Sequence, residues 1–319
     1  MNRLWPGLLV LMLGACAPSL APHQLKVVEP PTLSRTDTLY FGVYGDNRAK
    51  SLADVKPGAK LRQRRQALTK ALVGEPFDLL LNTGDLVKNN KSAFWQAFLE
   101  DSRPLLRPGF FYPVLGNHEY QAGSPEPYFE AFAAMVEGAK SYAFSLGPAY
   151  FLFLDSTSRP HPGLGDNYHA GWVQERLSEA AASPVLVVVQ HHPLLSTGRG
   201  DLTRWLLSPR AGHAPRRAEK GLRDMLADEL ARRRRQIPGA RTVVFNGHSH
   251  FYEYYRYQGV EVYVTGGGGA PQNDPAPGPQ DHRLAAYKGD HYLRVRLDSE
   301  QVEVELVPVG PGEWIQASP

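Results

Sequence analysis

Residues 77–85 read FDLLLNTGD, an apolar run that ends in a glycine and an aspartate. A short apolar run bounded by turn residues is typical of a buried strand. It follows a helical pattern over residues 59–73, and that pattern follows a second apolar run, LYFGVYG, which begins at residue 39. Strand, helix and strand in this order predict a β-α-β opening.

The alternation continues toward the C-terminus. Further strands are expected at residues 111–115, 150–155, 185–190 and 242–246, and helices at residues 92–103, 125–137, 171–182 and 217–235. After residue 250 only strand patterns remain, as in FYEYYRY, VEVYVTG, YLRVRL and QVEVELVPV. Mixed units followed by consecutive strands predict an α/β (α+β) protein in which sheets pack together and helices lie outside.

Composition and charge narrow the class of protein. The 319 residues are 42% hydrophobic, which is too apolar for disorder and sufficient for a sizeable core, and we expect one domain rather than two. Lys and Arg number 35 against 32 Asp and Glu, a net charge of +3, so no nucleic-acid partner is expected. The basic run at residues 232–235 ends a helical pattern before Pro238, where cations meet the negative end of the helix dipole, and is interpreted as a solvated cap.

The N-terminus has the pattern of a secretion signal. Arg3 precedes an apolar stretch over residues 4–13, which is shorter than the ~20 residues that cross a bilayer. The segment LGAC at residues 13–16 resembles the bacterial lipoprotein cleavage box, and Cys16 is the only cysteine. We therefore expect a signal peptide over residues 1–15, a lipidated Cys16 at the start of a proline-rich tether over residues 16–38, and a folded domain over residues 39–319. The lipid on Cys16 would anchor the protein to the bacterial cell envelope, outside the cytoplasm. Ordinary signal cleavage is the alternative.

Five short polar signatures stand at or near the ends of predicted strands. They are GDNR at 45–48, GD at 84–85, GNHE at 116–119, HHP at 191–193 and GHSH at 247–250. One Gly-Asp after a strand is usually a turn, whereas His248 and His250 would point to one side of a strand and could face one metal. Carboxylate, amide oxygen and imidazole together suit manganese, iron or zinc.

In this order, the five signatures resemble those of the calcineurin-like metallophosphoesterase superfamily, and most of all its purple-acid-phosphatase-related branch. The resemblance covers about residues 39–309, and its supporting phrases are NTGDLV at 82–87, YPVLGNHE at 112–119, VVVQHHPLLSTG at 187–198, NGHSHFYE at 246–253 and VTGGGGA at 264–270. It implies a four-layer αββα sandwich, with two mixed β-sheets flanked by helices and the metal site at the sheet edge.

The resemblance also implies a dinuclear centre. Asp85 would bridge two metal ions, of which the first is also held by Asp46 and His250 and the second by Asn117, His191 and His248. His118 would bind no metal but would lie beside the phosphoryl group, to donate a hydrogen bond or to protonate the leaving group. His191 is preferred to its neighbour His192 because the family pattern places the ligand two residues before the proline.

Such a centre implies hydrolysis of a phosphorylated small molecule or other phosphoester. Two cations, here manganese, iron or zinc, lower the pKa of a shared water, so that a metal-bridging hydroxide can attack phosphorus in line. A phosphomonoesterase is the first expectation. The alternatives are a phosphodiesterase with the same centre, distinguished by the loops around residues 156–170 and 266–290, and a catalytically silent metal-containing lipoprotein that binds a phosphorylated ligand.

Two positions depart from the family pattern. The family commonly has a histidine two residues after the first aspartate or a tyrosine three residues after the bridging one, and this chain has Arg48 and Lys88 there. The first metal is therefore expected to lack a ligand, and without the tyrosine the protein is expected to be colourless. The planar Arg48 fork suits bidentate phosphate binding, and a surface ion pair is the alternative.

Other residues carry weaker signals. Asp155 could orient a histidine or simply form a turn, and the aromatic run at residues 251–257 is expected to pack in the sheet. Four further residues could line the substrate cleft, although residues of these types are more often on the surface or in loops: Tyr120, Arg199, His213 and His282. Motifs of phosphate-binding loops, nucleophile elbows and dinucleotide-binding folds are absent from the sequence, so those enzyme classes lose support.

Overall fold

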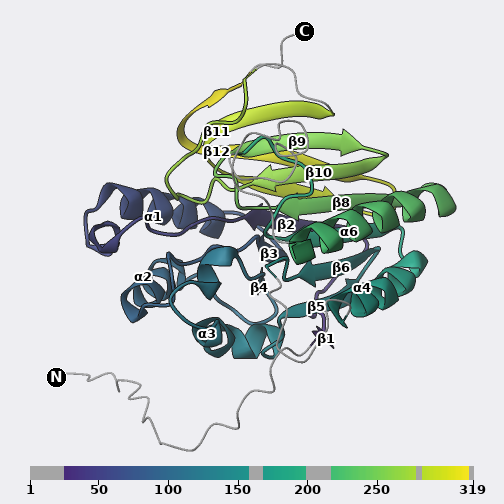
Figure 1. Ribbon diagram of the computed structural model, residues 1–319, viewed down its shortest axis with the longest axis horizontal. Helices are drawn as coiled ribbons and strands as arrows, with labels where there is room; N and C mark the ends of the chain where they lie inside the picture. Colours follow the sequence, from purple (N-terminus) through teal and green to yellow (C-terminus); the bar gives the residue numbers. More distant parts are fainter. Residues whose placement is uncertain (1–24, 158–167, 199–216, 278–281, 316–319) are drawn as a thin grey trace, which may run out of the picture.

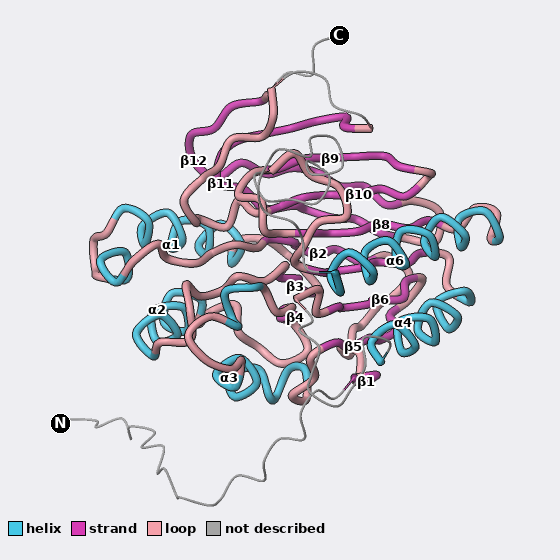
Figure 2. Tube along the Cα trace, viewed as in Figure 1, coloured by secondary structure: helices cyan, strands magenta, loops and turns pink. Residues whose placement is uncertain are grey.

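The strands of the computed structural model join in one curled, mixed sheet with helices outside it (Figures 1 and 2). The structure describes residues 25–157, 168–198, 217–277 and 282–315. The strands are β1 (Leu25–Val27), β2 (Leu39–Tyr44), β3 (Leu79–Asn82), β4 (Phe111–Pro113), β5 (Ser141–Leu146), β6 (Ala149–Leu154), β7 (Val185–Gln190), β8 (Arg241–Asn246), β9 (Tyr252–Tyr257), β10 (Val260–Thr265), β11 (Arg283–Leu297) and β12 (Val302–Trp314). The helices are η1 (Leu52–Val55), α1 (Lys60–Val73), α2 (Ser92–Ser102), η2 (Asn117–Tyr120), α3 (Glu126–Val136), α4 (Tyr168–Glu179), η3 (Ala180–Ala182) and α6 (Arg217–Gln236).

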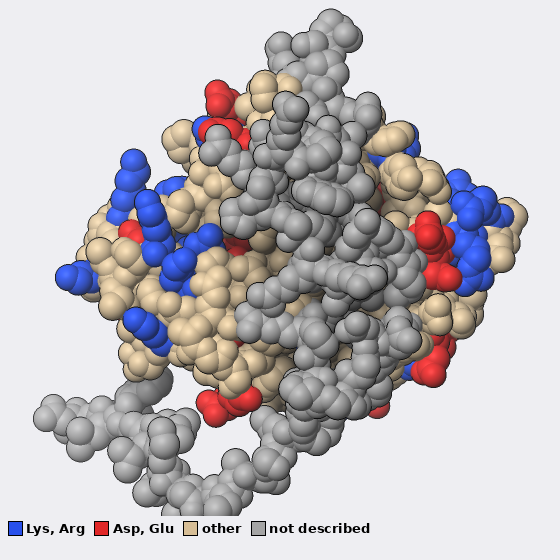
Figure 3. Space-filling view, viewed as in Figure 1, with Lys and Arg blue, Asp and Glu red and all other residues tan. Residues whose placement is uncertain are grey.

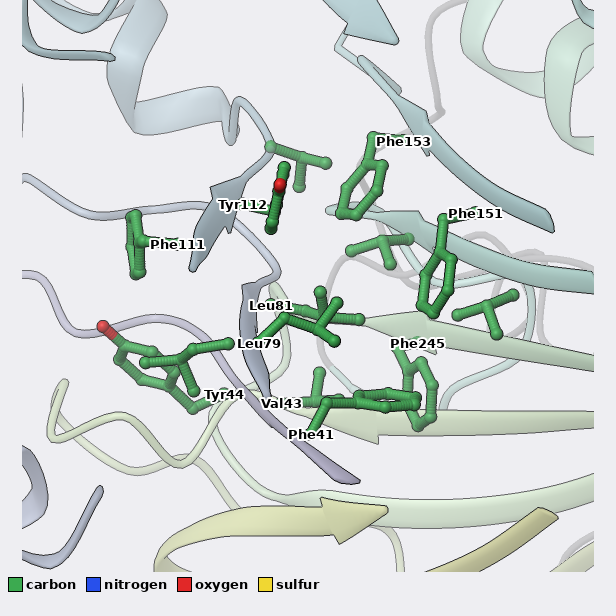
Figure 4. Packing of buried hydrophobic residues seen from close by; sticks show 14 of the residues in the cluster. Phe41, Val43, Tyr44, Leu79, Leu81, Phe111, Tyr112, Phe151, Phe153 and Phe245 are labelled. Atoms are coloured by element: carbon green, nitrogen blue, oxygen red, sulfur yellow. The ribbon is translucent and has the colours of Figure 1, made fainter. Parts of the chain in front are cut away.

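The sheet folds over on itself, so its two halves face each other. The strand order is β1-β5-β6-β7-β8-β10-β9-β11-β2-β3-β4, with β12 paired to β11. We call β2, β3 and β4 the β2 limb, and the strands from β1 to β9 in this order the β6 limb. Although β2 and β6 are far apart in this order, the Phe41 ring lies 5.7 Å from that of Phe151 and 6.3 Å from that of Phe245. Figure 4 shows these rings meeting between the limbs, so the shared core lies there.

The expected two sheets are therefore two limbs of one hydrogen-bonded ladder. The long strand β11 makes the connection, because its first part pairs with β9 and its last part with β2. Its register shifts between Gly289 and His291, and such a bulge bends a strand. The αββα layering is confirmed, while the separation of the β layers into two sheets is wrong.

Helices cover the outer face of each limb. On the β6 limb, the side chains that alternate with the core-facing ones form a second buried cluster with α4 and α6, to which Leu152, Val173 and Leu230 belong. Helices α1, α2 and α3 lie on the opposite side of the molecule in Figure 1, beside the β2 limb. The α/β class, with helices outside paired β layers, is therefore confirmed.

Two boundaries differ from expectation. Strand β1 pairs in parallel with β5, and the Val28 N–H donates to Ala143 O over 3.0 Å, so the sheet already begins within the tether expected over residues 16–38. Three residues without proline suffice for such an edge strand. Residues 283–290, expected in a loop, form the first part of β11.

The basic run at the end of α6 is partly buried. Figure 3 shows Lys and Arg side chains over α1 and the end of α6, with acidic side chains beside them. Arg233 donates from its guanidinium to Ser183 O over 2.6 Å and to Ala180 O over 3.2 Å, so the solvated cap is wrong for this residue. No helix of the described residues has the length and apolar character that a membrane crossing needs.

Candidate metal site

Two buried aspartates follow the ends of β2 and β3. Asp46 and Asp85 both have positive φ, 58° and 55°, in the left-handed region that aspartate tolerates better than most residues. The Asp46 N–H donates to Gly84 O over 2.9 Å, so the two turns hold each other. The Gly-Asp pairs are thus turns, as is usual, and the same turns bring two carboxylates to one place.

The first group of possible ligands consists of Asp46, Asp85 and His250, whose ligand atoms lie within 4.8 Å of one another. The Nδ1 of His250 lies 2.5 Å from Pro271 O, and since a carbonyl can only accept, Nδ1 donates. Its Nε2 then directs a lone pair toward Asp46 Oδ1 at 3.3 Å, a buried oxygen that has no hydrogen-bond partner among the described residues. Although burial opposes it, hydrogen bonding and proximity to the Asp46 carboxylate raise the pKa of His250.

The second group brings Asn117, His191 and His248 together beside Asp85. Asn117 Oδ1 lies 3.1 Å from both His191 Nε2 and His248 Nδ1, and His191 Nε2 lies 3.4 Å from Asp85 Oδ1. The Nδ1 of His191 donates to Thr83 O over 2.9 Å, so its Nε2 directs a lone pair into the group. Lone pairs of nitrogen and oxygen that converge in this way, with a histidine oriented by a carbonyl, fit a metal cation.

Between the neighbouring histidines, His191 is the one that reaches Asp85. The Nδ1 of His192 lies 3.0 Å from Ser156 Oγ, and its ring lies 4.8 Å from that of His248. His192 can nevertheless be grouped with His191 and His248 as a possible ligand. Burial lowers the pKa of both neighbours well below the usual range, which keeps them neutral, as metal ligands must be.

His118 lies against the shared carboxylate without belonging to either group. Its N–H donates to Asp85 Oδ1 over 2.9 Å, and its Nδ1 donates to Lys88 O over 2.6 Å. The ring is thereby fixed with Nε2 toward Asp85 Oδ2, at 3.7 Å. Burial, with Arg48 nearby, lowers the pKa of His118 to about 3.

Arg48 extends into the site rather than over the surface. Its side chain is 15% exposed, with Nε 3.4 Å from Asp85 Oδ2 and Nη2 3.5 Å from His250 Nε2. Burial and the neighbouring Asp46 raise the pKa of Asp85 to about 6, and Arg48 opposes that rise. The alternative of a surface ion pair is therefore wrong, because the partner of Arg48 is a buried carboxylate of the site.

Two supporting features were not expected from the sequence. The Glu119 carboxylate accepts the N–H groups of Gly116 at 2.7 Å, Asp85 at 3.1 Å and Val87 at 3.1 Å, and so joins two site loops. The glycine run after β10 closes over Asp46, since Gly268 N donates to Gly45 O over 2.8 Å and Ala270 N to Asp46 O over 3.0 Å. The signals were the glutamate in GNHE and the four consecutive glycines.

The weaker candidates lie elsewhere. Asp155 accepts from Tyr120 Oη at 2.5 Å, Lys140 Nζ at 3.0 Å and Thr157 N at 2.8 Å, so among its described contacts it orients no histidine. Tyr120 is half-buried and tied to Asp155 by this bond, and the His282 ring packs 5.0 Å from that of Tyr257. Cys16, Arg199 and His213 lie outside the described residues.

Comparisons with known proteins agree with the fold and the motifs. The chain is 32% identical over 120 residues to the 3',5'-cyclic adenosine monophosphate phosphodiesterase CpdA of Escherichia coli, and 27% identical over 141 residues to that of Vibrio vulnificus. These matches cover 37% and 43% of this chain but only 41% and 48% of the relatives. The calcineurin-like phosphoesterase family pattern matches residues 43–252.

Solved structures show the same fold at low sequence identity. A purple acid phosphatase from yellow lupin seeds superposes with a TM-score of 0.66 at 16% identity, over 89% of this chain and 54% of that one. GAP50, the anchor in the inner membrane complex of Plasmodium, gives 0.58 at 14% identity, over 88% and 90%. With the family pattern spanning well over half of its length, the chain belongs to the calcineurin-like phosphoesterase family.

Proposed function

We propose that this protein hydrolyses phosphoesters, and phosphomonoesters in particular, with metal ions held by the residues around Asp85. The observation that carries the proposal is the convergence of nitrogen and oxygen lone pairs on both sides of this one carboxylate. This arrangement fits a metal cation, and family membership supports a phosphoester as substrate.

The ligand assignment has two parts that share Asp85. The first position uses Asp46, Asp85 and His250, and the second uses Asp85, Asn117, His191 and His248. This mixture of imidazole, amide and carboxylate suits manganese, iron or zinc. When bound, such cations polarise phosphate oxygens and lower the pKa of water at neutral pH.

The protein's own residues do the positioning. Because Nδ1 donates to Lys88 O, Nε2 is the ring atom of His118 that faces the site, and in the protonated ring it would donate to a phosphate oxygen or pass a proton to the leaving group. Arg48 directs its guanidinium into the same site. A phosphomonoester carries a second negative charge that a diester lacks. The fixed positive charge of Arg48 beside the phosphate site therefore favours the monoester as substrate.

A phosphodiesterase with the same ligands is the second candidate. The similarity to two enzymes named as cyclic adenosine monophosphate phosphodiesterases favours it. This chain spans less than half of their length. The similarity therefore supports the type of reaction at the site more strongly than it supports a particular substrate.

We also propose that Cys16 is lipidated and anchors the chain outside the cytoplasm. The motif at residues 13–16 supports this, and β1 leaves only a short segment between Cys16 and the sheet. Labelled palmitate should be incorporated by the wild-type chain and not by Cys16→Ser, which should leave the membrane fraction.

The central test measures bound metal and hydrolysis on one sample. The full-length chain, purified in detergent and stripped by a chelator, is titrated with Mn²⁺, Zn²⁺ or Fe²⁺ while p-nitrophenyl phosphate and bis(p-nitrophenyl) phosphate are assayed. We expect metal-dependent hydrolysis with the monoester preferred. Preference for the diester would support the second candidate, and bound metal without hydrolysis of either ester would indicate a silent binding protein.

Two variants separate metal binding from turnover. His118→Ala should retain metal and lose about 10²–10⁴ in rate, the range typical of general acid–base catalysis. Asp85→Asn should lose both metal and rate, because Asp85 is shared by both ligand groups. An unchanged rate in His118→Ala would show that the proposed role of this residue is wrong.

A further inference from the structure

A positive charge of the protein already faces the first ligand group. Arg48 spans this group, with Nε 3.4 Å from Asp85 Oδ2 and Nη2 3.5 Å from His250 Nε2. In the second group, Asn117 Oδ1 lies 3.1 Å from both His191 Nε2 and His248 Nδ1. A metal ion at the first group would therefore meet a permanent cation of the protein itself.

Arg48 is kept in the site by burial and ion pairing, since its Nε has no hydrogen-bond partner among the described residues. Its side chain is mostly buried, and both atoms that it approaches belong to residues buried in the site. A guanidinium stays protonated at every pH at which the protein is folded, so its charge cannot be released to make room for a metal ion. The residue also stands where the sequence would otherwise be expected to supply a further ligand.

We infer that Arg48 serves as a built-in cation of the first group, so that one metal ion binds tightly, at the second group, and a second ion binds only weakly. This inference rests on the ligand assignment of the proposed function. A second ion must approach a fixed positive charge and displace the Arg48 contacts with Asp85 and His250. A unit charge a few ångströms away changes a binding free energy enough to weaken the second site by at least about tenfold.

The consequence concerns how the site works at limiting metal. One ion at the second group, with Arg48 across from it, places two positive charges on opposite sides of Asp85. In a two-metal enzyme, the second ion binds a phosphate oxygen. Here the Arg48 guanidinium would bind that oxygen instead. Arg48 would be a substrate-binding residue as well as a determinant of metal stoichiometry.

The test counts metal ions without using activity. Mn²⁺ binding to the full-length, chelator-stripped chain is measured by calorimetry, and coupling between bound ions by electron paramagnetic resonance. For the wild type we expect one tight equivalent, a second at least about tenfold weaker, and an uncoupled spectrum below the second binding step.

Two variants and one matched control complete the design. Arg48→Met removes the charge at similar length and should strengthen the second binding step, and Arg48→His adds an imidazole and should give two tight equivalents with a coupled spectrum. Arg176→Met is the control, because the Arg176 side chain is 13% exposed, much as that of Arg48 is, but pairs with Glu175 and Glu179 on α4, and it should bind metal like the wild type.

Three results would overturn the inference: two equal tight equivalents in the wild type, a second step unchanged in both Arg48 variants, or an equal gain in Arg176→Met. Absence of any metal binding would instead contradict the ligand assignment of the proposed function. Loss of hydrolysis with the expected binding steps would contradict only the proposed activity.

Discussion

Glu119 is the residue on which the relative placement of the site loops depends. One carboxylate receives N–H groups from Gly116, at the start of η2, and from Asp85 and Val87, in the loop after β3. Asp85 and Asn117 belong to these two loops, so the separation of two proposed ligands is set by a side chain that belongs to neither ligand group.

Glu119→Gln should destabilise the protein and weaken metal binding. An amide has one oxygen in place of two, so at least one of these buried N–H groups would face the NH₂ group without an acceptor. Leaving such a group unpaired costs about 1–3 kcal/mol. The free energy of unfolding in urea, measured with chelator present, gives the stability change, and calorimetry gives the metal affinity.

The exposed Glu130→Gln in α3 is the control and should change stability by less than about 0.5 kcal/mol. Equal stability of Glu119→Gln and the wild type would show that the carboxylate is not the element that joins the loops.

The sequence indicates the site residues better than it indicates what supports them. The predicted ligands Asp46, Asn117 and His248 sit in short motifs at strand ends, and the structure brings these strand ends together. Glu119 accepts mainly backbone N–H groups, and Asp155 accepts from the side chains of Tyr120 and Lys140. No sequence motif identifies these partners. Such roles depend on the tertiary fold, so the sequence indicates the turn at Asp155, where the Thr157 N–H donates to the carboxylate, but not its bonds to Tyr120 and Lys140.

At the scale of elements, the glycine run after β10 places one backbone directly against another. A Cβ on Gly268 would lie 2.1 Å from Gly45 O, and one on Gly267 would lie 2.1 Å from the His291 ring. Asp46 is the next residue after Gly45, so any shift there moves a proposed ligand.

Gly268→Ala should therefore weaken metal binding and lower stability, because backbone atoms cannot rotate away as a side chain can. Thermal unfolding and Mn²⁺ calorimetry measure the two effects. Gly171→Ala in α4 is the control, since a Cβ there meets nothing within 4 Å, and alanine favours a helix. Normal metal affinity in Gly268→Ala would mean that this part of the run does not set the position of Asp46.

His291, in β11 behind the glycine run, gives the fold a dependence on pH. Its Nδ1 donates to Gly289 O over 2.9 Å, its Nε2 has no hydrogen-bond partner among the described residues, and burial lowers its pKa to about 4. The unfolded chain, with an ordinary histidine pKa near 6.5, binds more protons between these two values. Stability from this residue is therefore complete above about pH 6.5 and falls as the pH decreases toward 4.

His291→Phe should lose less stability than the wild type between pH 6.5 and pH 4.5. Both proteins are compared with chelator present, so that acid release of metal does not enter the difference, and urea unfolding gives the free energy at each pH. An identical loss in both proteins would show that His291 is not the titrating group.

The elements themselves were largely predictable, because apolar periodicity decides them. The patterns at residues 59–73 and 185–190 correspond to α1 and β7. Strand β1 was missed because three residues in a proline-rich segment show no period, and the continuity of the sheet was missed because it depends on where β11 bends.

At the scale of the whole molecule, the proposed ligands come from both limbs. Asp46, Asp85 and Asn117 follow strands of the β2 limb, whereas His191 and His248 follow strands of the β6 limb. The two limbs already share one core, where Phe41 meets Phe151 and Phe245. A metal ion at this edge would add a further connection between the limbs, at the rim of that core.

Metal removal should therefore lower the stability of the whole molecule in one cooperative transition. A ligand that binds only the folded state, at a concentration 100 times its dissociation constant, raises the free energy of unfolding by about 2.7 kcal/mol. Each kcal/mol corresponds to about 2–4 °C in Tm for a protein of 150–250 residues, and to somewhat less for a longer protein. We expect chelation to lower Tm by several degrees while circular dichroism and tryptophan fluorescence still report the same midpoint.

Asp85→Asn provides the reference, because a chain that binds no metal should show no change in Tm with chelator. Two separate transitions after chelation would mean that the metal, rather than the shared core, holds the limbs together, and an unchanged wild-type Tm would mean that the cation does not connect them.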